Sequence, residues 1–117
     1  MKKLLLFGFD DLPSILAVEA AAKPFGAELV PVPRSACGQT LASLAERGPV
    51  PGGTGGLLGE RMIVFCGLER ELDGLLAALK AAGAASGCLK AVLTPGNRGW
   101  TAARLCGELQ RERQALR

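Results

Sequence analysis

Three stretches of the chain are apolar at nearly every position, a pattern typical of strands buried on both faces of a sheet. They run from Lys3 to Phe9, from Met62 to Cys66 and from Leu89 to Leu93. A fourth, weaker strand is predicted for residues 27–32. Pro31 and Pro33 remove backbone N–H donors from it, so we place this strand at an edge of the sheet.

The segments between the strands show helical periodicity, and we predict four helices. They cover residues 12–23, 39–47, 69–82 and the stretch from about 101 to the C-terminus. Asp11 can cap the first helix, because its side chain can accept hydrogen bonds from the N–H groups of the first turn. The side chains expected to face inward are, in helix order, Leu12, Ile15, Leu16 and Ala20; Leu41 and Leu44; Leu68, Leu72, Leu75, Leu76 and Leu79; and Leu105, Cys106 and Leu109.

A short motif occurs twice along the chain. Phe7-Gly8-Phe9-Asp10-Asp11 is echoed by Cys66-Gly67-Leu68-Glu69-Arg70, each time at a strand end that leads into a leucine- and alanine-rich helix. A duplicated β-α-β unit explains both occurrences. The predicted fold is therefore α/β, a small three-layer sandwich with a four-stranded, mainly parallel sheet. A ferredoxin-like α+β fold with extra helices is the alternative, and the fully apolar strands favour the sandwich.

We treat residues 1–117 as a single domain with a flexible Gly/Pro-rich loop at 48–59. The loop contains Gly53-Thr54-Gly55-Gly56-Leu57-Leu58-Gly59, which superficially resembles a dinucleotide-binding pattern. A phosphate-binding turn follows a strand and opens a helix, whereas this segment precedes a strand. A linker is therefore the better interpretation, and we expect no cofactor.

The composition argues against several classes of function. The chain has no histidine, so it lacks the residues of Ser-His-Asp and Cys-His catalysis, and we expect no metal. The net charge of +3 is spread along the chain and aromatic residues are scarce, so we expect no nucleic-acid binding.

No apolar run approaches the ~20 residues that a membrane span needs, and no targeting signal is evident, so we expect a cytoplasmic protein and no membrane partner. The four cysteines are expected to be reduced. Cys66, at a strand end before a helix, is the one best placed for a lowered thiol pKa. We nevertheless interpret it as a core residue, because no second cysteine lies near it in the sequence.

The densest group of polar side chains lies between the last strand and the last helix. Thr94, Asn97 and Arg98 stand there, where open α/β sheets bind ligands and helix N–H groups attract anions. Turn chemistry is the favoured interpretation, in which Asn97 or Thr101 caps the helix and Arg98 is solvated. The alternative is a site for a small anionic ligand, formed by these three residues beside the turn at Gly67.

Lys90 and Trp100 flank this group, and we interpret both as structural. A lysine at the start of a strand usually extends to solvent and covers apolar surface with its stem. Trp100 is predicted to anchor the last helix where it docks, under Arg104 one turn further on.

One resemblance covers the second half of the chain. It rests on an apolar strand, Gly67-Leu68-Glu69-Arg70-Glu71-Leu72-Asp73, a leucine-rich helix, and Lys90-Ala91-Val92-Leu93-Thr94 followed by Asn97 and Trp100. From roughly Arg61 to Leu116 the chain resembles a bacterial family designated domain of unknown function 3783. The resemblance implies a small bacterial α/β protein, and it supplies neither an activity nor catalytic residues.

Two hypotheses about function follow. The first is a non-enzymatic, cytoplasmic regulatory or protein-interaction module that forms homo-oligomers, for which the apolar composition and an exposed edge strand argue. The second is a binding domain or enzyme for a small anionic ligand at the strand-end edge near Thr94 to Thr101.

Overall fold

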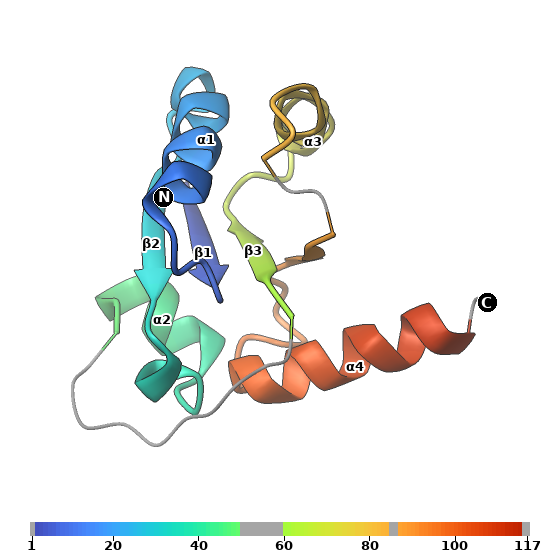
Figure 1. Ribbon diagram of the computed structural model, residues 1–117. Coiled ribbons are helices and arrows are strands. Elements are labelled where there is room, and N and C mark those ends of the chain that lie inside the picture. The colour runs from blue at the N-terminus through green and yellow to red at the C-terminus, as the bar shows by residue number, and fades with distance from the viewer. Residues whose placement is uncertain (1, 50–59, 85–86, 116–117) are drawn as a thin grey trace.

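The computed structural model describes residues 2–49, 60–84 and 87–115, and Figure 1 shows its layers. Most of the predicted loop at 48–59 lies outside the described residues. The sheet has four strands in the order β2-β1-β3-β4: β1 (Lys3–Phe7), β2 (Glu28–Val32), β3 (Met62–Cys66) and β4 (Leu89–Val92). The β1–β2 and β3–β4 pairs are parallel, and the central pair, β1–β3, is antiparallel. The predicted mainly parallel sheet is therefore confirmed, with one antiparallel pair.

Helices cover both faces of the sheet, as the three-layer prediction requires (Figure 1). One face is covered by α1 (Leu12–Ala22) and α3 (Leu72–Ala81), which lie side by side. The other face is covered by α2 (Leu41–Arg47) and α4 (Ala102–Ala115). Short 3-10 turns at Lys23–Phe25 and Arg34–Ala36 flank β2. Each half of the chain thus runs strand-helix-strand-helix, whereas a common origin of the halves stays a prediction.

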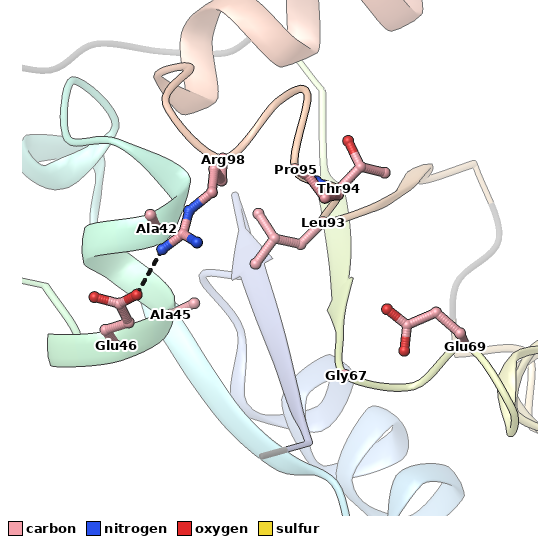
Figure 2. A pocket seen from close by; sticks show the side chains of 9 residues that line it. All are labelled: Ala42, Ala45, Glu46, Gly67, Glu69, Leu93, Thr94, Pro95 and Arg98. Carbon is pink, nitrogen blue, oxygen red and sulfur yellow. Dashed lines mark hydrogen bonds and ion pairs between the residues drawn. The ribbon is translucent and has the colours of Figure 1, made fainter.

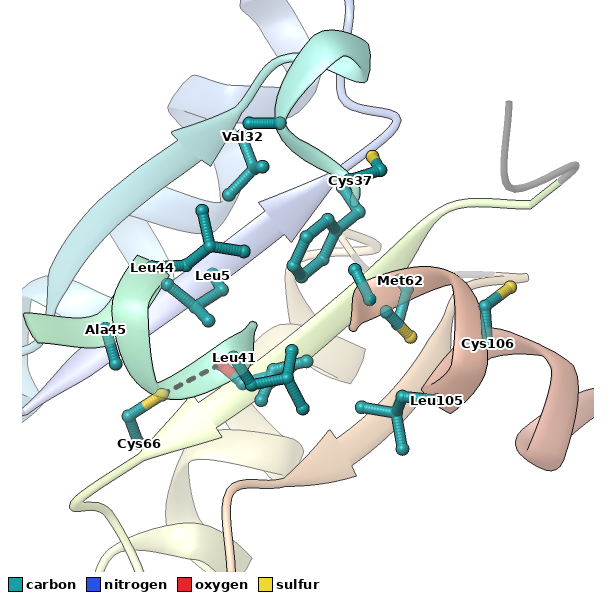
Figure 3. Packing of buried hydrophobic residues seen from close by; sticks show 14 of the residues in the cluster. Leu5, Val32, Cys37, Leu41, Leu44, Ala45, Met62, Cys66, Leu105 and Cys106 are labelled. Carbon is teal, nitrogen blue, oxygen red and sulfur yellow. Dashed lines mark hydrogen bonds between the residues drawn. The ribbon is translucent and has the colours of Figure 1, made fainter. Parts of the chain in front are cut away.

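The strands alternate their side chains between two apolar clusters, because successive residues of a strand point to opposite faces. Leu4, Leu6, Ile63 and Phe65 pack under α1 and α3. On the other side, Leu5, Phe7, Met62 and Val64 pack against α2 and α4, as Figure 3 shows for part of this cluster. All five residues of β3 are buried, which explains its unbroken apolar sequence.

At both edges of the sheet, some of the backbone groups that could pair with another strand are missing or already used. The N–H of Glu28 donates to the carbonyl of Lys2 beside β1 (2.9 Å), so the backbone polar groups of Leu29 and Pro31 point away from β1, toward the open edge. Proline has no N–H, and β2 is left with one outward donor. On β4, the side chains of Lys90 and Asn97 donate to the carbonyls of Cys88 (3.3 Å) and Val92 (3.1 Å). The edge position predicted for β2 is confirmed, but that edge offers little for another strand to pair with.

The inward stripe predicted for α1 is wrong at three of its four positions. Leu12, Leu16 and Ala20 are exposed, and the helix buries Val18, Ala21 and Ala22 instead. Ser14 and Glu19 are the only polar residues of α1, so apolar spacing could not distinguish one side of the helix from the other.

The other helices bury most of the side chains that their periodicity predicted. Leu41 and Leu44 of α2, Leu75 and Leu79 of α3, and Leu105 and Cys106 of α4 are buried. Leu68 is buried as well, although α3 begins only at Leu72. Among the described residues, none of these helices is long and apolar enough to cross a membrane.

Candidate functional site

A cavity of about 280 Å³ opens at the carboxyl ends of the parallel strands β3 and β4 (Figure 2). Its wall comes from three segments that are far apart in the sequence. These are α2, the turn after β3 and the loop after β4, which contribute Ala42, Ala45 and Glu46, then Gly67 and Glu69, then Leu93, Thr94, Pro95 and Arg98. The carboxyl ends of adjacent parallel strands are where α/β proteins usually bind ligands.

Three of the residues singled out from the sequence line this cavity, namely Gly67, Thr94 and Arg98. They lie together because β3 and β4 are neighbours and run in the same direction. Gly67 has a positive φ of 68°, which lets the chain turn sharply out of β3. Whether the cavity binds a ligand stays a prediction.

Asn97 does not line the cavity, because its side chain holds the loop after β4 in shape. Its Oδ1 accepts a hydrogen bond from the N–H of Thr94 (2.8 Å), and its Nδ2 donates to the carbonyl of Val92 (3.1 Å). In return, the hydroxyl of Thr94 accepts from the N–H of Asn97 (3.2 Å). The helix cap belongs to Thr101, whose hydroxyl accepts from the N–H of Arg104. Both polar atoms of the Asn97 side chain are therefore used in hydrogen bonds within the turn.

The charges around the cavity do not favour anions alone. Arg98 donates to Glu46 at 2.8 Å, and both side chains are more than half exposed. Glu69 adds a second carboxylate to the same wall. An anion that binds Arg98 must therefore displace Glu46, an exchange that an exposed ion pair permits at small cost.

The N-terminus of α2 is closed by the loop that carries Arg98. The carbonyls of Arg98 and Trp100 accept hydrogen bonds from the N–H groups of Ala42 and Leu41, each at 2.9 Å. These donors are used by the protein itself, so α2 offers no free N–H groups to a ligand there. The same bonds fix the position of Arg98 relative to Glu46.

Lys90 and Trp100 lie away from the cavity. The ammonium group of Lys90 curls back onto the carbonyl of Cys88, on the exposed edge of β4. Trp100 is half-buried against the core, and the guanidinium of Arg104 stacks over its ring at 4.2 Å. This stacking is the contact that the sequence predicted one turn into the last helix.

Cys66 ends β3 next to the cavity, but it is buried and its Sγ contacts the carbonyl of Val64 at 3.9 Å. Burial raises the pKa of its thiol to about 11, although nearby Lys3 opposes that rise. A thiol with so high a pKa is not a nucleophile at neutral pH. All four cysteines are free, and no group of metal-binding side chains occurs within the part of the chain that the structure describes.

The exposed side of α1 is a second candidate site, which the sequence did not reveal. Leu12 is 64% exposed and Leu16 is 51% exposed, and Pro13 and Ala20 are exposed beside them. We call these four residues the leucine face. It lies on the opposite side of α1 from the buried residues Val18, Ala21 and Ala22. A helix that is apolar all round is normally covered on all sides, so the exposure of these residues marks the leucine face as a candidate interaction surface.

Comparison with protein families gives a match to the second half of the chain. Residues 61–116 match the model described as Domain of unknown function (DUF3783). The resemblance predicted for roughly Arg61 to Leu116 is confirmed. Comparison with the curated proteins and with the solved structures produced no match.

The DUF3783 match covers part of the cavity wall and none of the leucine face. It contains β3, α3, β4 and α4, and with them Gly67, Glu69, Thr94 and Arg98. The α2 wall of the cavity and the whole leucine face lie before residue 61, outside the DUF3783 segment. The ion pair between Glu46 and Arg98 therefore joins the first half of the chain to the DUF3783 half.

Proposed function

We propose that this protein is a non-enzymatic interaction module that self-associates through the leucine face of α1. The single observation that carries the proposal is the exposure of Leu12 and Leu16 on a helix with almost no polar residue. Fully burying a leucine side chain contributes about 1.5–3 kcal/mol, so two half-exposed leucines on each copy favour association. The proposal includes a bacterial source, which the family resemblance implies, and a cytoplasmic location, which the sequence implies.

The sheet edges support this choice of surface. Pairing along β2 is disfavoured by Pro31, and the end carbonyls of the β4 segment already accept side-chain donors. A second copy that docks on the helical layer avoids both obstacles. We therefore propose that the copies associate through α1 and not through the edge strand that the sequence suggested.

The described acidic residues with a shifted pKa also favour a non-enzymatic role. The hydrogen bond from Lys2 lowers the pKa of Glu71, and the hydrogen bonds from Ser14 lower that of Asp11. A carboxyl group that acts as a general acid near neutral pH needs a raised pKa instead, so neither residue fits that role.

Sedimentation velocity over a range of concentrations tests the proposal. We expect the parent protein to form dimers reversibly and Leu16→Glu to remain monomeric, because the substitution places a charge inside the contact. Ala103→Glu on the exposed side of α4 is the matched control, and it should dimerise like the parent. Circular dichroism of all three proteins confirms that they are folded. A parent protein that stays monomeric at millimolar concentration would contradict the proposal.

A small anionic ligand at the cavity is the second candidate function, favoured by the meeting of Gly67, Thr94 and Arg98 on one wall. Thermal shift with inorganic phosphate as the probe tests it. The parent should be stabilised, Arg98→Ala should not respond, and Glu46→Gln should respond at lower phosphate concentration, since Arg98 is then released from its partner. No shift with either the parent or Glu46→Gln would reject the anion site.

A further inference from the structure

The leucine face is flanked by charged residues at both ends, which gives the helix a direction. Leu12, Leu16, Ala20 and Lys23 are spaced four, four and three residues apart, so they form one stripe that continues from α1 into the following 3-10 turn. Glu19 is exposed beside this stripe. Neither Glu19 nor Lys23 forms an ion pair with any residue in the described ranges.

The charges at the two ends of the stripe have opposite sign. Asp10 and Asp11 precede the first turn of α1, and Asp10 has a side chain 66% exposed, paired only at the surface with Arg34 (3.0 Å). Lys23 stands at the other end. Two parallel copies of the stripe would place Lys23 beside Lys23 and Glu19 beside Glu19, which is unfavourable. Two antiparallel copies would bring Lys23 near Asp10, and their helix dipoles would also oppose each other favourably.

We infer that two copies of the chain pair through antiparallel α1 helices about a two-fold axis at Leu16. The inference rests on the proposed function and specifies its partner and its geometry. About this axis Leu16 contacts its own counterpart, and each Leu12 faces Ala20 of the second copy. A large side chain then meets a small one on both sides of the axis, which is the pattern that allows packing helices to interdigitate.

The contact is small, so the pair should be transient. An eleven-residue helix is about 16 Å long and presents a strip roughly 10 Å wide. This area is well below the roughly 800 Å² per partner of a standard stable interface. The structure therefore points to a reversible dimer whose population depends on protein concentration.

Cysteine cross-linking tests the direction of the pairing. The background is Cys88→Ser, because Cys88 is the half-buried thiol and the other three are buried. With oxidised glutathione as the two-electron oxidant, two facing thiols lose their protons and become one disulfide. We expect Leu16→Cys to form disulfide-linked dimers quickly and Leu12→Cys to do so slowly. A mixture of Leu12→Cys and Ala20→Cys chains should give the mixed dimer quickly.

Equal cross-linking of Leu12→Cys and Leu16→Cys, with no mixed Leu12–Ala20 product, would indicate parallel helices and overturn the inference. The proposed function would stand in that case, provided that Leu16→Glu still abolishes the dimer seen by sedimentation. Absence of any dimer in sedimentation would overturn both.

A charge exchange gives a second measurement that needs no cysteine. Lys23→Glu should raise the dissociation constant of the dimer roughly two- to tenfold. This range is expected for an exposed ion pair that occurs twice in the dimer because of the two-fold axis. Adding Asp10→Lys to Lys23→Glu should restore the affinity of the parent. Restoration supports the antiparallel pair, and a double variant weaker than Lys23→Glu alone contradicts it.

Discussion

Asp11 connects three parts of the chain through one side chain. Its Oδ2 accepts hydrogen bonds from the N–H (3.0 Å) and the hydroxyl (2.6 Å) of Ser14, as an N-cap does. Its Oδ1 accepts from Arg61 at 2.6 Å, just before β3. The guanidinium of Arg61 also lies 5.1 Å from the ring centre of Phe9. The sequence predicted the cap, because the cap depends on local spacing, but not the contact with Arg61, which depends on the pairing of β1 with β3.

Substitution of Asp11 should affect stability in a pH-dependent way. The hydrogen bonds from Ser14 and the charge of Arg61 hold the pKa of Asp11 below its ordinary value of 3.8. A lowered pKa in the folded state stabilises the protein above the ordinary pKa, and this contribution is lost as the pH falls through the folded value. We expect Asp11→Asn to lower the melting temperature by a few degrees at pH 7, and the difference should shrink below pH 3.8.

The control for this measurement is Asp10→Asn, which removes only an exposed ion pair with Arg34 and should change the melting temperature little. An Asp11→Asn deficit that persists unchanged well below pH 3.8 would show that the charge of Asp11 does not contribute.

Comparison of α1 with α3 shows what apolar spacing can and cannot predict about an element. In α3 the leucines are separated by charged and small residues, and the two at the centre of the stripe, Leu75 and Leu79, are buried as predicted. In α1 nearly every residue is apolar, and its inner side is decided by its neighbour α3 and the sheet. The buried side of α1 is therefore a tertiary property, and the leucine face could not be found from spacing alone.

The two kinds of leucine should differ clearly in their contribution to stability. Leu75→Ala leaves a cavity between α3 and the sheet, and we expect it to lower the free energy of unfolding by about 2–5 kcal/mol. Leu12→Ala removes an exposed side chain and should cost roughly 0.5 kcal/mol or less. Urea denaturation at low protein concentration, where copies are separate, measures both. Similar losses for the two variants would contradict the burial seen for α1.

At the scale of the whole molecule, the antiparallel β1–β3 pair sets which candidate residues can meet. The carboxyl ends of β3 and β4 open at one end of the sheet, and those of β1 and β2 open at the other. The meeting of Gly67 with Thr94 could be predicted from two adjacent parallel strands. The contribution of Glu46 could not, because it depends on where α2 packs on the sheet.

The reactivity of each cysteine thiol depends on how deeply the thiol is buried in the molecule. Cys37, Cys66 and Cys106 are buried and Cys88 is half-buried, and burial raises the pKa of each. At pH 8 a thiol with a pKa of about 11 is ionised in about one molecule in a thousand. We expect a thiol reagent to label Cys88 first in the native protein and the other three only after unfolding. Peptide mapping checks this order, and rapid labelling of Cys66 would contradict the packing at the end of β3.

Pro31 of β2 also bears on the kind of assembly that we propose. A sheet that accepts strands at its edge can grow without limit, since each added copy presents a fresh edge to the next. Pro31 has no N–H to donate at the outer edge of β2, so it disfavours growth along that edge. In the proposed dimer the contact lies on the helical layer, where a two-fold contact uses the same surface on both copies and closes the assembly at a finite size.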